Sequence, residues 1–219
     1  HLRHADHRWI RKHLGIVGLR LVEELGGRSC LPLEDCPLPK QSITCSRSFG
    51  TPITTLVEME EAVSAYVSRA AEKLRREGLA AMCLTIFLTT NSFKVGPQYS
   101  NALTGKFPVA TDSTPELIRL TLQGIRQLYR EGYEYKKAGV LLTGLVSASQ
   151  VQTDLFDQHD RVRSKQLMVA FDQINDRWGA GTLRYAATGL HRVWTTQFHR
   201  RSPAYTTNWD ELPLVHATS

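Results

Sequence analysis

The sequence has no long apolar run and few cysteines. Its longest apolar stretches, residues 80–84 and 138–142, have the length of a strand, whereas a helix that spans a membrane needs about 20 apolar residues. None of the four cysteines is part of a C-x-x-C pair, and no histidine lies at zinc spacing from them. We therefore expect no membrane association and reduced thiols in a cytoplasmic protein.

Signatures of catalysis are also missing. No Asp-x-Asp or Asp-Glu element falls on an apolar strand, and the chain has neither a G-x-S-x-G elbow nor a glycine-rich phosphate loop. Nucleotidyl transfer with two metal ions needs converging carboxylates, so we expect a chain that is not catalytic by itself and holds no cofactor. His1, His4 and His7 have a spacing that could hold a metal, but at a chain end solvated side chains are expected.

The charge is unevenly distributed. The formal net charge is +6, which suits an anionic partner. Between Glu77 and Asp112 the only charged residues are Lys94 and Lys106. Between Asp176 and Asp210 no acidic residue occurs, and the basic residues there are Arg177, Arg184, Arg192, Arg200 and Arg201. Such stretches predict positive surfaces for phosphates, with binding that weakens as salt rises.

The periodicity predicts a helical segment followed by a compact α+β domain. Residues 8–25 have the pattern of a helix, a turn and a second helix, which ends at Gly26 and Gly27. Three prolines in residues 28–40 indicate a linker. The segments that follow alternate as strand 41–49, helix 56–77, strands 80–90 and 102–109, a helix after Ser113 and strand 135–146. Ser113 and Glu116 have the spacing of a capping box.

The order βαββαβ is that of a ferredoxin-like split βαβ fold, a four-stranded antiparallel sheet with two helices on one face. The other face is left open, which in a basic protein favours nucleic-acid binding. Alternation along strand 41–49 puts Arg47 on the apolar side unless a twist or bulge re-aims it. After residue 147 the sequence predicts a polar loop, a helix over 161–178 and a short strand over 183–187, so a small α/β extension follows.

Five segments resemble the UmuC branch of the Y-family DNA polymerases. They are SITCSRSFG (42–50), AYVSRAAEKLR (65–75), YKKAGVLL (135–142), RSKQLMVAFDQINDRWGAGTL (163–183) and RSPAYTTNWDELPLV (201–215). The resemblance implies five regions. They are the end of the thumb (1–27), a proline-rich linker (28–40), the little-finger domain (41–147), a clamp-binding loop (148–160) and the UmuC C-terminal extension (161–219).

The same resemblance implies what is absent. The palm, with its carboxylates and Mg²⁺, and the fingers would lie before His1, so we expect that residue to be a cut edge. The intact parent would be a DNA-directed DNA polymerase that copies damaged DNA with errors during the SOS response. This chain would hold primer–template DNA and tether the polymerase to the sliding clamp. The alternative is a regulatory protein-interaction module that binds no DNA.

Two candidate sites follow from the strands and the loop after them. Gln152, Leu155 and Phe156 resemble the Q-x-x-L-F peptide that binds the sliding clamp, although the two apolar residues could instead fasten the loop to the protein's own surface. The resemblance also implies that side chains on or beside the strands contact the phosphates of template and primer. The predicted DNA-binding residues are Ser46, Arg47, Ser48, Lys94, Lys136 and Lys137. Neighbours on a strand point to opposite faces, so at most one of Lys136 and Lys137 can lie squarely over the open face. The alternative is that both are merely solvated side chains at the start of their strand.

Two basic clusters lie outside the sheet. One contains Arg192, Arg200, Arg201, Tyr205 and Trp209. Its aromatic and basic residues suit either single-stranded bases or a protein partner, and the resemblance implies a UmuD′-type dimer and the RecA filament as partners. The other contains Arg69, Lys73, Arg75 and Arg76. For this second cluster we favour a solvated helix surface with a Glu72–Arg76 pair.

Overall fold

The computed structural model describes residues 2–33, 39–152, 157, 160–190, 192, 194–195 and 202–213. The chain divides into two compact units, His1–Pro39 and Lys40–Ser219. The first contains the short 3-10 helix η1 (Leu2–His4) and helix α1 (His7–Leu25). Helix α1 is broken at Gly15, where φ is 68° and ψ is −166°. A positive φ is a conformation that glycine adopts easily, which explains the predicted turn between two helical halves.

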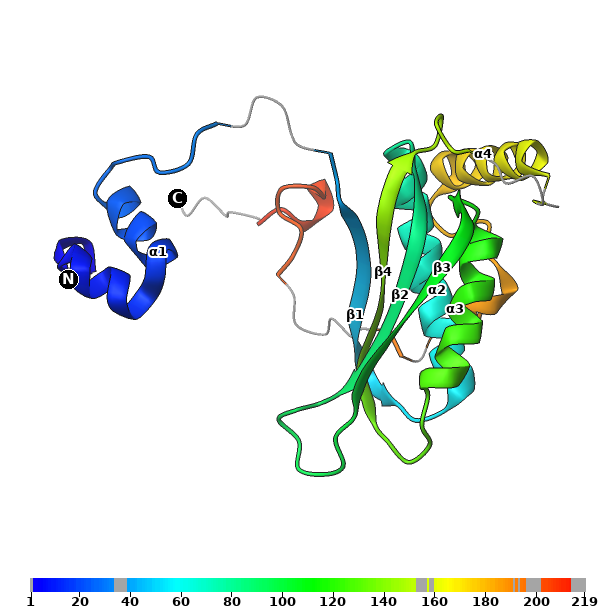
Figure 1. The fold of residues 1–219 in the computed structure, drawn as a ribbon, viewed down its shortest axis with the longest axis horizontal. Coiled ribbons are helices and arrows are strands. Elements are labelled where there is room, and N and C mark those ends of the chain that lie inside the picture. Colours follow the sequence, from blue (N-terminus) through cyan, green and yellow to red (C-terminus); the bar gives the residue numbers. More distant parts are fainter. Residues whose placement is uncertain are drawn as a thin grey trace, which may run out of the picture. The chain divides into compact units, whose positions relative to one another are not determined.

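The second unit contains the predicted βαββαβ series (Figure 1). Its elements are β1 (Ser42–Ile53), α2 (Leu56–Arg76), β2 (Leu79–Thr90), β3 (Ser100–Thr111), α3 (Thr114–Leu128) and β4 (Tyr135–Ser147). The strands form one antiparallel sheet in the order β1-β4-β2-β3. Strand β4 therefore lies between the parallel strands β1 and β2, which α2 connects. Strand β2 likewise lies between β3 and β4, so the predicted split βαβ fold is confirmed.

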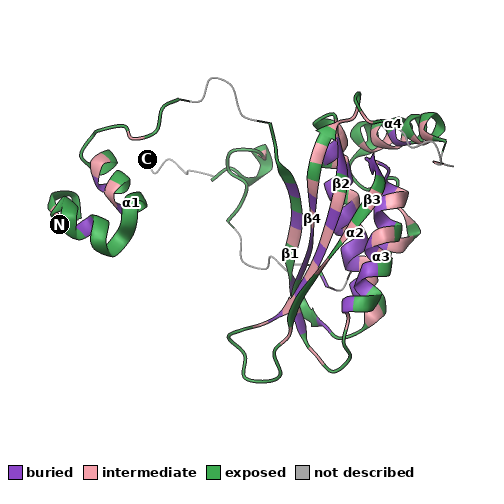
Figure 2. Cartoon of the chain, in the orientation of Figure 1, coloured by how far each residue is buried: buried purple, intermediate pink, exposed green. Residues whose placement is uncertain are grey.

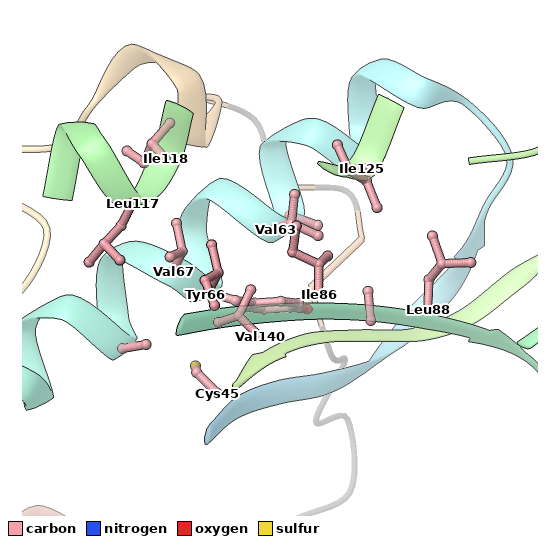
Figure 3. Close-up of a cluster of buried hydrophobic side chains, with 14 of the residues drawn as sticks. Cys45, Val63, Tyr66, Val67, Ile86, Leu88, Leu117, Ile118, Ile125 and Val140 are labelled. Carbon is pink, nitrogen blue, oxygen red and sulfur yellow. The ribbon is translucent and has the colours of Figure 1, made fainter. Parts of the chain in front are cut away.

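Both helices cover the same face of the sheet, and the core lies between them and the strands (Figures 1 and 2). Helix α2 begins after Thr55, whose hydroxyl accepts a hydrogen bond from the Glu58 amide. Its apolar face then points into the core, and Figure 3 shows Val63, Tyr66 and Val67 close to the sheet. Helices α2 and α3 therefore leave the opposite face of the sheet uncovered, as far as the described residues go.

The extension begins with α4 (Arg161–Trp178) and continues to the 3-10 helix η2 (Ala186–Thr188). The strand predicted over residues 183–187 is wrong. The side-chain amide of Asn175 donates to the Leu183 carbonyl at 3.2 Å and accepts from the Leu183 amide at 2.9 Å. Because this side chain occupies both backbone groups, Leu183 does not pair with a strand.

The predicted capping box at α3 is also wrong. Ser113 precedes the helix, but its side chain makes no capping hydrogen bond. The Ser113 hydroxyl instead accepts from Ser164 of α4 at 3.3 Å, and Glu116 pairs with Arg161 at 3.2 Å. Both side chains serve the contact between α3 and α4, which the local sequence pattern does not reveal.

No helix in the described part of the chain is long and apolar enough to cross a membrane. The described residues likewise contain no group of three or more His, Cys, Asp and Glu side chains arranged to hold a metal ion. Cys30, Cys45 and Cys83 form no disulfide, and Cys36 lies outside the described residues.

Candidate nucleic-acid interface

The open face of the sheet is defined by four rows of residues that pair across the strands. Directly paired residues in an antiparallel sheet have side chains on the same face. From β1 through β4 and β2 to β3, the rows are Ser42–Thr143–Cys83–Lys106, Thr44–Leu141–Thr85–Thr104, Ser46–Gly139–Phe87–Ala102 and Ser48–Lys137–Thr89–Ser100. We call these rows the open face.

Hydroxyl groups dominate the open face, and no Asp or Glu occurs in its four rows. Two of the hydroxyls, those of Thr85 and Thr104, lie 2.7 Å apart in a cross-strand hydrogen bond. Lys106 and Lys137 supply positive charge, and both are exposed. Hydroxyls and ammonium groups are donors that bind phosphate oxygens without selecting a base.

The structure separates Ser46 and Ser48 from Arg47. The pairing of β1 with β4 is regular from Ser42 to Ser48, and the register shift comes only between Ser48 and Ile53. No bulge therefore re-aims Arg47, which stays on the helix side with Ile43 and Cys45.

The electrostatics agree with that placement. Burial raises the pKa of the Cys45 thiol and of the Tyr66 hydroxyl, and the nearby charge of Arg47 acts in the opposite direction on both groups. Cys45 and Tyr66 belong to the core under the helices. Arg47 is exposed on that side of the edge strand β1, away from the serines on either side of it.

The three predicted lysines differ in their surroundings. Lys137 lies in the open face between Ser48 and Thr89. The ammonium group of Lys136 donates to the carbonyl of Phe49 at 2.6 Å, so it holds β4 to β1. Lys94 lies in the loop between β2 and β3 and pairs with Glu134.

The clamp and C-terminal candidates are only partly described. Gln152 is exposed, whereas Leu155 and Phe156 lie outside the described residues, as do Arg200 and Arg201. The Arg192 guanidinium donates to the carbonyl and hydroxyl oxygens of Thr188. Burial lowers the pKa of Arg192, and the charge of Arg184 acts in the same direction. Tyr205 and Trp209 are exposed, with Trp209 in the 3-10 helix η3 (Trp209–Glu211).

Sequence reasoning missed Thr85, Thr104, Lys106 and Phe87 as members of the open face. Alternation along β2 does show that Thr85 and Phe87 lie opposite the apolar set Leu84, Ile86 and Leu88. Pairing these residues with β3 and β4 requires the register, which a single strand does not contain.

On the helical side of the domain, helix α4 of the extension contacts helix α2. The guanidinium of Arg75 in α2 binds Asp172 of α4 through two bonds, Nε to Oδ2 at 2.6 Å and Nη2 to Oδ1 at 2.7 Å. Its Nη1 donates to the Asp112 carbonyl at 2.9 Å and to the Thr114 hydroxyl at 2.8 Å. The Arg75 side chain is only 9% exposed. The solvated surface predicted for it is therefore wrong, while the expected Glu72–Arg76 pair is present at 2.8 Å.

A second contact fastens the segment after η2. Trp194 is 5% exposed and lies in the core, edge-on to Tyr66 at 5.6 Å and to Phe49 at 6.3 Å between ring centroids. Its carbonyl accepts a hydrogen bond from the Gly50 amide at 3.2 Å. Its indole nitrogen is buried with no partner in the described residues. The extension therefore contributes a side chain to the core beneath the sheet.

Comparison with known proteins identifies the two segments of the second unit. Residues 40–155, more than half of the chain, match the family model described as the impB/mucB/samB family C-terminal domain. The chain belongs to the impB/mucB/samB family. Residues 165–215 match a second model, described as a domain of unknown function (DUF4113). The expected likeness to the UmuC branch of the Y-family polymerases is confirmed, with the little-finger domain followed by the extension.

Individual relatives of this impB/mucB/samB chain agree. Protein SamB of Salmonella typhimurium is 38% identical over 219 residues, which cover 99% of this chain and 51% of SamB. Protein UmuC of Salmonella typhimurium is 38% identical over 208 residues, 94% of this chain and 49% of UmuC. DNA polymerase IV of Pelotomaculum thermopropionicum is 26% identical over 185 residues, 82% of this chain and 43% of that protein. The chain spans about half the length of the curated relatives that it matches.

Among solved structures, a Y-family DNA polymerase chimera resembles this family member with a TM-score of 0.43 and 14% sequence identity. The match covers 66% of this chain and 41% of the chimera.

Proposed function

We propose that this chain holds primer–template DNA for a UmuC-type translesion polymerase and tethers that polymerase to the sliding clamp. The observation that carries the proposal is the open face, which has many hydroxyls, two lysines and no carboxylate. The helical side, by contrast, uses its carboxylates in ion pairs such as Arg75–Asp172 and Arg126–Glu60. The helical side thus presents charges of both signs, whereas the charged side chains of the open face are all positive, which favours a polyanion such as DNA.

Binding through such a face depends on salt and not on sequence. Each lysine that neutralises a phosphate contributes about 0.9 to the slope of log affinity against log salt. Lys106 and Lys137 are both exposed on this face, so both can make this contact. Replacing both by alanine should reduce the magnitude of the slope by about 2.

The test is fluorescence anisotropy of a labelled primer–template across a salt series. The matched control replaces Lys73 and Lys165, two exposed lysines on helices α2 and α4, by alanine. We expect the control to bind with a nearly wild-type slope and the Lys106→Ala, Lys137→Ala variant to bind weakly at all sequences alike. A variant slope equal to that of the wild type would refute the use of this face.

The tether is assigned to residues 152–156. Leu155 and Phe156 suit an apolar pocket, and the exposed Gln152 suits directional hydrogen bonds at its rim. Binding to the clamp raises the effective concentration of the polymerase at the DNA, which compensates for a weak affinity of this module for DNA. Leu155→Ala with Phe156→Ala should abolish binding of the chain to the immobilised clamp and leave its circular dichroism unchanged; undiminished clamp binding would contradict the assignment.

Nucleotidyl transfer itself is assigned to the palm of the intact parent, which would hold its Mg²⁺ on carboxylates. This chain, incubated with primer–template, nucleotides and Mg²⁺, should extend no primer. Extension by the purified chain would overturn the division of labour between palm and little finger.

A second candidate function, a protein-interaction module, is favoured by the loop between β2 and β3. Phe93 and Val95 are almost fully exposed there, although the loop is ordered by hydrogen bonds from the Gln98 amide to the carbonyls of Asn91 and Lys94. Exposed apolar side chains on an ordered loop suit a protein surface. Retention of the chain on protein partners, with none on DNA at low salt, would favour this candidate over the first.

A further inference from the structure

An aromatic ring lies in the centre of the open face with no role in the core. Phe87 is half-buried, and it is absent from the residues that pack against the hydrophobic core. Its neighbours along β2, Ile86 and Leu88, are both buried under the helices. A phenylalanine on the hydroxyl-lined face therefore needs another explanation.

The position of the ring depends on Gly139 of β4. A Cβ atom built on Gly139 would lie 2.6 Å from Cζ and 3.0 Å from Cε1 of Phe87, and 2.3 Å from Cβ of Ser46. Adjacent strands are about 4.8 Å apart, and strand side chains ordinarily stand upright. The Phe87 ring therefore reclines from β2 across β4 and covers the bare backbone of the glycine. Any other residue at position 139 would displace it.

A reclining ring has one face against the sheet and the other toward solvent. The open face surrounds it with Leu141, Ser46, Thr85 and Thr89, which supply an apolar patch and hydroxyl donors. Lys137 lies in the next row. An aromatic surface with phosphate-binding groups beside it is the arrangement on which proteins stack single-stranded bases, because each base has a π-face.

A purely structural role of the Phe87 ring, that of covering Gly139, does not explain the hydroxyls and lysines around it. An aromatic side chain across a glycine stabilises a sheet by shielding the backbone, and that role is satisfied on a buried face as well as on an open one. Here the ring lies among hydroxyls on the face without helices, with cationic side chains in two of the four rows.

The geometry points to Phe87 as a stacking platform for one unpaired nucleobase, so that the open face binds single-stranded DNA as well as duplex. This inference rests on the proposed function, since it places the base on the same face as the phosphates. The ligand class is a single-stranded oligodeoxynucleotide with any base at the stacked position.

The test compares the full chain and three variants by anisotropy on a 12-nucleotide single strand and on the matching duplex. Phe87→Leu keeps an apolar side chain and removes the ring, whereas Phe87→Tyr keeps the ring. Phe93→Leu makes the same chemical change at a phenylalanine that is 96% exposed and outside the sheet. We expect Phe87→Leu to weaken single-strand binding on the order of tenfold, within the contribution of one base–aromatic stack, with duplex binding and the other two variants near wild type.

Unchanged single-strand affinity in Phe87→Leu, with duplex binding intact, overturns the inference and leaves the proposed function standing. Loss of affinity equal for both DNA forms also overturns it, because a merely structural ring would act on both alike. No binding of either form by the wild type removes the proposed function and the inference together.

A measurement on the unaltered chain removes any dependence on how the variants fold. Photo-crosslinking with a single strand that carries 5-iodouracil labels aromatic side chains in contact with the base. Mass spectrometry should locate the crosslink on Phe87. Crosslinks confined to other residues would overturn the assignment.

Discussion

The contact between Arg75 and Asp172 predicts how strongly the extension is fastened to the little-finger domain. Asp172→Ala removes both carboxylate oxygens from a guanidinium that is 9% exposed. The substitution leaves the bonds from Arg75 to the Asp112 carbonyl and the Thr114 hydroxyl in place. The arginine then keeps its charge, without a counter-charge, beneath helix α4.

The expected loss of free energy of unfolding in Asp172→Ala follows from the burial of Arg75 and Asp172. Removing one partner of a fully buried ion pair costs about 3–5 kcal/mol. Asp172 is 23% exposed, and half of the hydrogen bonds of Arg75 remain, so we expect about 2–3 kcal/mol. For a chain of 219 residues, each kcal/mol lowers the melting temperature by about 2–4 °C. The expected loss is therefore about 4–12 °C.

Asp176→Ala is the matched control, one turn later on the same helix. Asp176 pairs with Arg76 at 3.0 Å, but the two side chains are 62% and 55% exposed. Exposed pairs contribute about 0–1 kcal/mol, so this variant should melt within about 4 °C of the wild type. Urea unfolding followed by circular dichroism gives both free energies. If Asp172→Ala cost no more than Asp176→Ala, the reasoning that this buried pair holds the extension would be refuted.

Three further predictions concern the core and the sheet. Trp194→Ala should lower the free energy of unfolding by about 3 kcal/mol, the low end for removing a buried tryptophan, because its indole nitrogen has no partner among the described residues. The control Trp209→Ala, at an 87% exposed position, should melt like the wild type. Equal melting temperatures of the two variants would contradict this prediction. Burial raises the pKa of Tyr66 in the folded chain. The unfolded chain therefore loses this proton at lower pH than the folded chain, and the free energy of unfolding should fall as pH rises past about 10. Tyr66→Phe should reduce that fall between pH 8 and 10.5. An identical fall in the variant and the wild type would contradict this prediction. Gly139→Ala should cost about 1–3 kcal/mol by forcing a methyl group against Cβ of Ser46 and against the Phe87 ring. A wild-type urea midpoint would show that neither side chain needs the glycine.

The element order could be predicted because each element carries its own period. The stripe of Val63, Tyr66, Val67, Ala70 and Leu74 on α2 is fully local, and all five residues are buried as expected. Strand order is a property of pairs that are distant in the chain, and the position of β4 between β1 and β2 is not visible in any one segment. The same reason explains why the predicted strand over residues 183–187 is wrong, since a side chain eight residues earlier occupies its backbone groups.

The candidate site was predictable in part. Ser46, Ser48 and Lys137 share the open face, whereas Lys136 is engaged with a backbone carbonyl and Arg47 lies on the helix side. Alternation gives the face of each residue along its own strand, so it separates Lys136 from Lys137 but does not say which of them is solvated. Alternation along β2 places Phe87 opposite the buried Leu84, Ile86 and Leu88, but only the pairing with Gly139 on β4 shows where its ring lies.

The most direct test of the proposed interface is lysine footprinting of the wild-type chain with and without primer–template DNA. Acetylation of each lysine is measured by mass spectrometry at low salt. The account predicts that DNA protects Lys106 and Lys137 in the open face, while Lys73 and Lys165 on the helices are acetylated as in the free chain. Protection of Lys73 and Lys165, with Lys106 and Lys137 still fully acetylated, would place the DNA on the helical side and contradict the account.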